Sequence, residues 1–226
     1  MESVAQRLAE LREEVVFLGG AVTALLITDP AAAEVRFTAD VDVIVDLSSM
    51  VAYLQLAARL RRLGFTEDRS EDAPTCRWRV GGVKVDVMPT SEAVLGFSNR
   101  WYLPAIEHAE RRLVGSLSVR VVSAPYFVAT KLEAFEGRGR GDLRASHDLE
   151  DLVAVVDGRP ELGREVATAA EDLRGYLEER IGRLLDEPAF LEALPGHLPG
   201  DEASQGRVPL VLSRLREIAG RGDAAG

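Results

Sequence analysis

The chain has 226 residues, 46% of them hydrophobic, and a formal net charge of −10. This length and hydrophobic content indicate one domain, or one domain with a helical extension, and exclude a globally disordered chain. An acidic chain repels nucleic acid on average, which argues against a protein that coats DNA or RNA but still allows a local basic groove.

Neither a membrane span nor a targeting segment is predicted. No apolar run reaches the roughly 18 residues that a transmembrane helix needs. The first 14 residues are charged and amphipathic, unlike a secretory signal. The single cysteine, Cys76, excludes an internal disulfide and fits a reducing compartment. We therefore expect a cytoplasmic protein that does not contact a membrane.

The first half of the chain alternates predicted helices and strands. In chain order, the patterns predict a helix over 2–14, a strand over 15–18, a Gly19-Gly20 turn, a helix over 21–27, a strand over 41–47 and a helix that Ser48 or Ser49 caps and that runs to Leu63. Further strands are predicted over 65–68, 75–80 and 83–88, the last two joined by Gly81-Gly82, followed by a short helix over 90–95 and a hairpin of 105–114 with 117–122. Residues 105–113 also fit a helix.

From Pro125 onward the apolar spacing becomes helical. Helices are predicted over 125–136, from a Ser146 cap to 156, over 161–186 and over 208–219, with a loop over 195–206 and a frayed tail over 221–226. The predicted fold class is therefore α/β (α+β): a mixed sheet flanked by helices over residues 1–124, followed by an all-helical region over 125–226.

Three aspartates fall on predicted strands. Asp40 and Asp42 are two residues apart, so on a strand their side chains point the same way. Asp86 interrupts the apolar run around Val85 and Val87. If the two strands are neighbours, the three carboxylates meet at one edge, which is the oxygen-rich arrangement of a two-metal phosphoryl-transfer site. A lone aspartate at a strand end is more often a cap, so the prediction rests on the set.

The Gly19-Gly20 pair lies between a predicted strand and a helix. Glycine allows a phosphate to approach the backbone closely, and a helix N-terminus offers unpaired N–H groups. Such a pair is usually only a turn, but here it precedes the aspartate pair by about 20 residues with one helix between. One cysteine and three scattered histidines give no zinc pattern, and no P-loop supports a kinase or ATPase.

These motifs resemble the DNA polymerase β-like nucleotidyltransferase superfamily, whose signature is a glycine turn, an Asp-x-Asp pair and a third aspartate on a later strand. The segments that carry the resemblance are Leu18-Gly19-Gly20, residues 36–42 (RFTADVD) and Val85-Asp86-Val87. Two helices, over 127–135 (FVATKLEAF) and 147–152 (HDLEDL), are similar to the AbiEii/AbiGii toxin-like branch. The resemblance covers roughly residues 15–157, and His147 stands where the branch often has arginine.

The resemblance implies roles for further residues. Lys131 would contact the phosphates of an NTP, and Asp148 or Asp151, one helical turn apart, would close the site. From their position before the aspartate pair, and not from the resemblance, Arg36 and Thr38 could contact the triphosphate, although an ordinary loop role is as good an interpretation. The basic loop over 138–144 could contact RNA or the triphosphate, or be a solvated loop.

The sequence therefore predicts a nucleotidyltransferase that uses two Mg²⁺ ions and an NTP such as ATP, GTP or CTP. By resemblance, its acceptor would be RNA, tRNA or a protein, and it could be the toxin of a type IV toxin–antitoxin pair with a cognate antitoxin. One alternative is a small-molecule acceptor, as in enzymes that modify antibiotics, which the acidic charge mildly favours. A second is an inactive nucleotide-binding module, which the intact set of three aspartates opposes.

Overall fold

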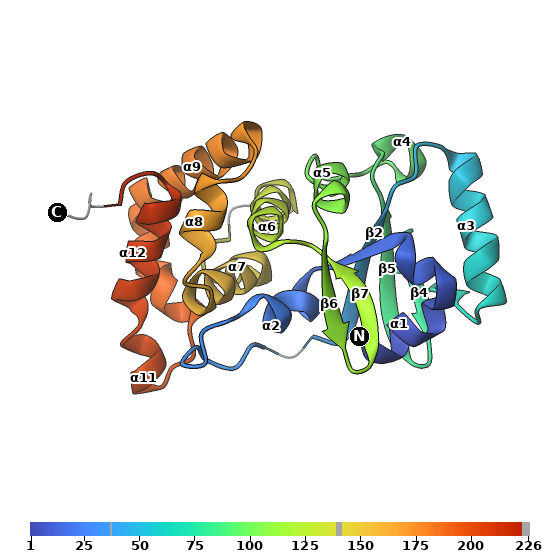
Figure 1. The fold of residues 1–226 in the computed structure, drawn as a ribbon, viewed down its shortest axis with the longest axis horizontal. Helices are drawn as coiled ribbons and strands as arrows, with labels where there is room; N and C mark the ends of the chain where they lie inside the picture. Colours follow the sequence, from blue (N-terminus) through green and yellow to red (C-terminus); the bar gives the residue numbers. More distant parts are fainter. Residues whose placement is uncertain (37, 139–141, 223–226) are drawn as a thin grey trace. The chain divides into compact units, whose positions relative to one another are not determined.

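The computed structural model describes residues 1–36, 38–138 and 142–222, apart from the Arg138 side chain. Phe37, residues 139–141 of the predicted basic loop and residues 223–226 of the predicted tail lie outside the described residues. The chain forms two compact units (Figure 1), which we call the sheet unit (1–22 and 36–123) and the helical unit (23–35 and 124–226). In the described part, no helix combines the length and apolar character that a membrane crossing requires.

The sheet unit is built on one mixed sheet of seven strands, which confirms the predicted fold class. The strands are β1 (Val15–Leu18), β2 (Asp40–Val45), β3 (Thr66–Glu67), β4 (Arg77–Val80), β5 (Val83–Pro89), β6 (Glu110–Val114) and β7 (Leu117–Val121). Their order is β3-β4-β5-β2-β1-β7-β6. Only two neighbouring pairs in this sheet are parallel, β2 with β5 and β1 with β7.

Alternation of side chains gives the two central strands one apolar and one mixed face. Val41, Val43 and Val45 of β2 are buried, as are Val85 and Val87 of β5. The register aligns these valines across the two strands, so they form one continuous apolar face. The aspartates occupy the alternate positions and therefore lie on the opposite face.

Helices of the sheet unit largely follow the sequence signals. They are α1 (Glu2–Leu8), η1 (Ala9–Glu13), η2 (Gly20–Val22), α3 (Met50–Arg62), α4 (Glu92–Leu95) and α5 (Tyr102–Glu107). The Ser49 side chain accepts a hydrogen bond from the Ala52 backbone N–H, as expected of a cap. The predicted helix over 2–14 changes to a 3₁₀ helix after Leu8, because Ala9 adopts a positive φ of 48°.

Both interpretations of residues 105–114 prove partly right. The helix α5 ends at Glu107, where the His108 backbone N–H donates to the Pro104 carbonyl, and the strand β6 begins at Glu110. The predicted hairpin partner 117–122 is β7, which pairs antiparallel with β6.

The helical unit contains more and shorter helices than predicted. They are α2 (Thr23–Leu26), α6 (Ala124–Arg138), α7 (His147–Gly158), α8 (Leu162–Ala167), α9 (Glu171–Asp186), α10 (Pro188–Ala193), η3 (Leu194–His197), α11 (Glu202–Gln205) and α12 (Val208–Ile218). The prediction of one helix over 161–186 is wrong: α8 ends at Ala167, and Ala170, whose ψ of 144° is not helical, separates it from α9. The predicted loop over 195–206 includes most of η3 and all of α11.

Residues 23–35 belong to the helical unit, although the predicted boundary near 124 assigned them to the first part of the chain. The backbone N–H groups of Thr28 and Asp29 donate to the Gly158 carbonyl at 2.8 and 2.9 Å. The Arg159 guanidinium donates to the Leu26 carbonyl at 2.8 Å. A Cβ at Gly158 would lie 2.6 Å from Ile27 Cγ1, so only glycine fits this contact.

Candidate active site

The two aspartate-bearing strands are neighbours. In the parallel β2/β5 pair, Asp42 is opposite Asp86, and Asp40 is opposite Lys84. All three aspartates occupy positions on the face opposite the buried valines, so the condition set by the sequence pattern is met. The Asp86 side chain is 13% exposed and that of Asp40 34%, so solvent reaches both. Like charges held this closely repel one another unless a cation lies between them.

This face also carries a positively charged side chain that the sequence analysis did not predict. Arg77 of β4 lies opposite Asp86. Its Nε and Nη2 donate to the two carboxylate oxygens of Asp86 at 2.8 and 2.7 Å, and Nη2 also reaches Asp40 at 3.4 Å. The hydrogen bonds to Asp86 raise the pKa of the Arg77 guanidinium above its ordinary value although burial opposes this. Arg77 is therefore a permanent positive charge between two of the aspartates.

A sequence signal for Arg77 existed. The two-residue turn Gly81-Gly82 has positive φ at both positions, 56° and 82°, which is the backbone of a tight hairpin. A two-residue turn fixes the strand register, and counting back from it pairs Arg77 with Asp86.

The glycine turn lies directly against Asp42. Gly19 has a φ of +72°, and a Cβ built there would be 1.8 Å from Asp42 Oδ2. The position therefore requires glycine both for its backbone conformation and for the approach of Asp42. Gly20 begins the 3₁₀ helix η2. The backbone of the turn and the Asp42 carboxylate thus form one compact polar feature at the end of β1.

Arg36 and Thr38 lie in the segment that leads into β2. Arg36 is exposed and Thr38 is half-buried. They flank Phe37, which is outside the described residues. Both belong to the sheet unit and precede Asp40, the first residue of β2.

Lys131 and the two aspartates of the 147–152 motif meet within the helical unit. Lys131 Nζ of α6 donates to Asp148 Oδ1 at 3.0 Å and to Asp151 Oδ2 at 2.6 Å, both on α7. Burial would lower the Lys131 pKa, but the charges of Asp151 and Asp148 outweigh it and leave that pKa raised. His147 instead pairs its Nδ1 with Glu150. Both aspartates therefore contact the lysine. The sequence alone did not show which of the two has a role.

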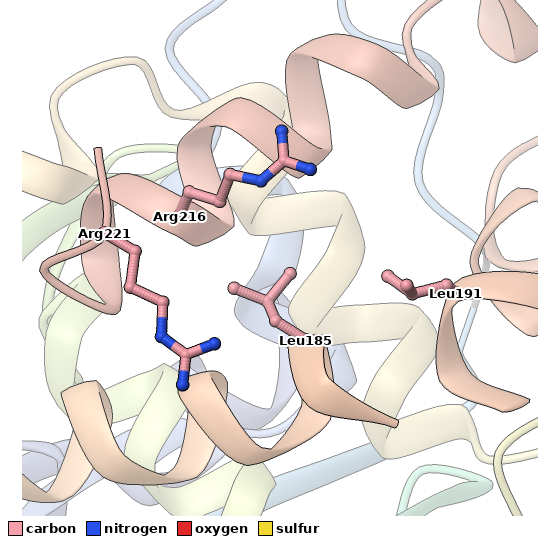
Figure 2. A pocket seen from close by; sticks show the side chains of 4 residues that line it. All are labelled: Leu185, Leu191, Arg216 and Arg221. Carbon is pink, nitrogen blue, oxygen red and sulfur yellow. The ribbon is translucent and has the colours of Figure 1, made fainter. Parts of the chain in front are cut away.

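A separate pocket of about 300 Å³ lies in the helical unit (Figure 2). It is lined by Leu185, Leu191, Arg216 and Arg221. The Arg221 guanidinium is engaged with both oxygens of Asp186, at 2.6 and 2.8 Å. None of the predicted site residues lines this pocket, so we assign it no part in the site.

Over the described residues, no three His, Cys, Asp or Glu side chains are grouped tightly enough to enclose a metal ion by themselves. Mg²⁺ does not need such a cage, since it commonly takes one or two carboxylates together with waters and substrate phosphates. The aspartate face offers hard oxygen ligands of this kind, and the donor set therefore fits Mg²⁺ with a bound triphosphate.

Comparison with known proteins matches one family model and several solved structures, two of which are described here. No curated protein matches the chain. A nucleotidyltransferase-like antigenic protein from Paracoccidioides brasiliensis is 20% identical, with a TM-score of 0.45 and coverage of 84% of this chain and 89% of that one. A nucleotidyltransferase candidate from H. pylori is 11% identical, with the same TM-score and coverage of 97% and 93%.

The family model that matches describes a nucleotidyl transferase AbiEii toxin of the type IV toxin–antitoxin systems, and the match runs over residues 5–217. It thus includes the glycine turn, all three strand aspartates and the Lys131 cluster. This chain belongs to the AbiEii family of nucleotidyl transferase toxins.

Proposed function

We propose that this protein transfers a nucleoside monophosphate from an NTP to an acceptor hydroxyl and releases pyrophosphate in a Mg²⁺-dependent reaction. The observation that carries the proposal is the alignment of Asp42 with Asp86 on neighbouring parallel strands, with Gly19 packed against Asp42. Family membership supports the same chemistry.

Asp40, Asp42 and Asp86 would hold the metal together with waters and the phosphates of the NTP. When bound, Mg²⁺ supplies positive charge that neutralises the triphosphate and the transition state. Asp86 accepts the proton of the acceptor hydroxyl, whose oxygen forms the new bond to the α-phosphorus while the bond to the pyrophosphate oxygen breaks. Arg77 holds the Asp86 carboxylate by a two-pronged hydrogen bond and so fixes its orientation.

The glycine turn and Lys131 are proposed to bind phosphate, with Arg36 and Thr38 as further triphosphate contacts. The backbone at Gly19 and Gly20 carries no side chain that would block a phosphate. Lys131 has three N–H donors, and among the described residues two of them are used by Asp148 and Asp151, which leaves the third for a phosphate oxygen. In this proposal the two aspartates orient the ammonium group rather than bind the nucleotide themselves.

The proposed acceptor is RNA, with tRNA as the first candidate, or a protein, and the proposed biological setting is the cytoplasm with a cognate antitoxin. The type IV toxin–antitoxin description of the family supports the antitoxin. The net charge of −10 favours the competing proposal of a small-molecule acceptor. An inactive nucleotide-binding module is less well supported, because Asp86 lies beside Asp42 and Arg77 contacts both Asp86 and Asp40.

The test is incubation of the pure protein with each α-³²P-labelled NTP, Mg²⁺ and total RNA. Asp42→Asn serves as the inactive variant. Asp72→Asn is the matched control, because it removes one exposed carboxylate of the same unit that is not among the proposed site residues. We expect label on RNA with wild type and Asp72→Asn but not with Asp42→Asn.

The other results are equally informative. Label on the protein itself would indicate self-modification or a protein acceptor. Label that persists in Asp42→Asn would contradict the assignment of the site. No transfer to RNA or protein, with NTP binding intact, would favour the small-molecule acceptor or the inactive module.

A further inference from the structure

The helix α3 exposes an apolar surface that the proposed chemistry does not use. Met50, Val51 and Leu54 are 45%, 66% and 56% exposed, and they are three of the eight large hydrophobic side chains that are exposed in the described chain. All three lie in the first five residues of this helix. Phe97, two residues after the helix α4 that contacts α3, is exposed as well.

These side chains are not the core face of the helix. The core face consists of Tyr53, Leu56, Ala57 and Leu60. The exposed face continues from Val51 and Leu54 through Gln55 and Ala58, at helical spacing, to Arg62. A helix that buries one apolar stripe normally exposes polar residues on the other side. Adjacent exposed apolar residues on a helix mark an interaction surface more often than isolated ones do.

The charge of this helix also differs from the rest of the chain. Residues 50–62 contain three arginines and no acidic residue, in a chain with a net charge of −10. Arg59 is paired with Glu14, and Arg61 is paired with Glu67. Arg62 donates only to the Ala58 carbonyl, so within the described residues it has no acidic partner. Arginines at a helix C-terminus stabilise the helix dipole, but this does not account for the apolar residues before them.

We propose that the exposed face of α3, from Met50 to Arg62, binds an acidic amphipathic helix of another protein. Apolar side chains of that helix cover Met50, Val51 and Leu54. The small side chain of Ala58 allows the two backbones to approach closely, and a carboxylate of the partner pairs with Arg62. The inference is independent of the proposed transferase activity, because none of these residues lies among the proposed catalytic residues.

Two other occupants fit the surface less well. A second copy of the chain would place α3 against α3 in a symmetric contact, and α3 offers its copy no carboxylate for Arg62. A membrane of anionic lipids would be held by a helix of only 13 residues in which, among the described residues, one arginine lacks an acidic partner, whereas membrane-binding helices carry several basic residues.

The test uses two synthetic helical peptides with the same leucine stripe, bordered by glutamates in one and by lysines in the other. Binding to the full chain is measured by fluorescence anisotropy. We expect the glutamate peptide to bind wild type, and roughly tenfold or weaker binding both for Leu54→Glu and for the lysine peptide. Leu113→Glu, at another exposed leucine of the sheet unit, is the matched control and keeps wild-type affinity. Thermal unfolding checks that both variants are folded.

Four results would overturn the proposal. The first two are failure of the glutamate peptide to bind wild type, and equal binding of the two peptides. The third is unchanged affinity in Leu54→Glu. The fourth is another occupant: either sedimentation shows a wild-type dimer that Leu54→Glu dissociates, or vesicles with anionic lipids bind wild type and release Leu54→Glu.

Discussion

Two charged clusters of this protein each combine aspartates with one basic residue, but they differ in how far solvent reaches them. In the sheet unit, Arg77 contacts Asp86 and Asp40, and Asp42 lies opposite Asp86, on a face that solvent reaches. In the helical unit, Lys131 is held by Asp148 and Asp151, and the Asp151 side chain is only 3% exposed. An excess of accessible carboxylate attracts cations, whereas a buried pair chiefly fixes the packing of α6 and α7. The difference places the proposed metal ligands on the accessible face and leaves the two aspartates of α7 to hold the Lys131 ammonium.

The largest expected effect is at Asp42. Asp42→Asn removes one carboxylate from the aspartate face while it keeps the shape of the side chain. We expect nucleotidyl transfer to fall by roughly a thousandfold or more, because charge stabilisation of the transition state is lost. If Asp42→Asn still transfers label from the NTP at the wild-type rate, the aspartate face is not the catalytic cluster.

In the buried cluster, removal of an aspartate should lower the stability of the protein. Asp151→Ala leaves the Lys131 ammonium with Asp148 as its only carboxylate partner among the described residues, and we expect a loss of about 3 kcal/mol in unfolding free energy. Urea denaturation measures the loss. Asp148→Ala should cost less, because the Asp148 side chain is more exposed. If the two variants unfold like wild type, the cluster is not structural and its proposed role in phosphate binding gains weight.

A substitution at Arg77 tests whether this side chain orients the Asp86 carboxylate or only supplies positive charge. Arg77→Lys keeps the positive charge but cannot form the two-pronged contact with Asp86. We expect transfer to drop by about 10- to 100-fold, mainly in kcat. Steady-state kinetics check this, and Arg79→Lys on the same strand is the control. Wild-type kcat in Arg77→Lys would show that only the charge at this position matters.

The smallest effect concerns the segment 23–35. The hydrogen bond from Arg207 lowers the pKa of Asp29, so the contribution of this contact to stability is present above the unfolded pKa of about 3.9 and is lost as the pH falls below it. Asp29→Asn should therefore lower Tm by about 2–4 °C at pH 7. The difference should shrink as the pH falls below about 4. A difference independent of pH would indicate that charge is not involved.

The sequence predicted the features that depend on local spacing. Asp40 and Asp42 alternate along one strand, and the hairpin at Gly81-Gly82 leads directly to Asp86. Features that depend on contacts between residues far apart in the sequence were not predicted. Residues 23–35 join the helical unit through Arg159 and Arg207, and the contacts of these arginines span 133 and 178 residues of sequence. The break between α8 and α9 lies at the non-helical backbone of Ala170, which the helical periodicity of residues 161–186 does not reveal.

The place of residues 23–35 has a consequence for experiments that shorten the gene. This segment lies between the glycine turn and the aspartate pair in sequence, yet Gly158, Arg159, Glu161 and Arg207 hold it in place. A stop codon after residue 124 would remove all four. The truncated product would carry a loose insertion next to its proposed catalytic residues. Deletion mapping would then score the C-terminal region as essential even if none of its side chains met a nucleotide.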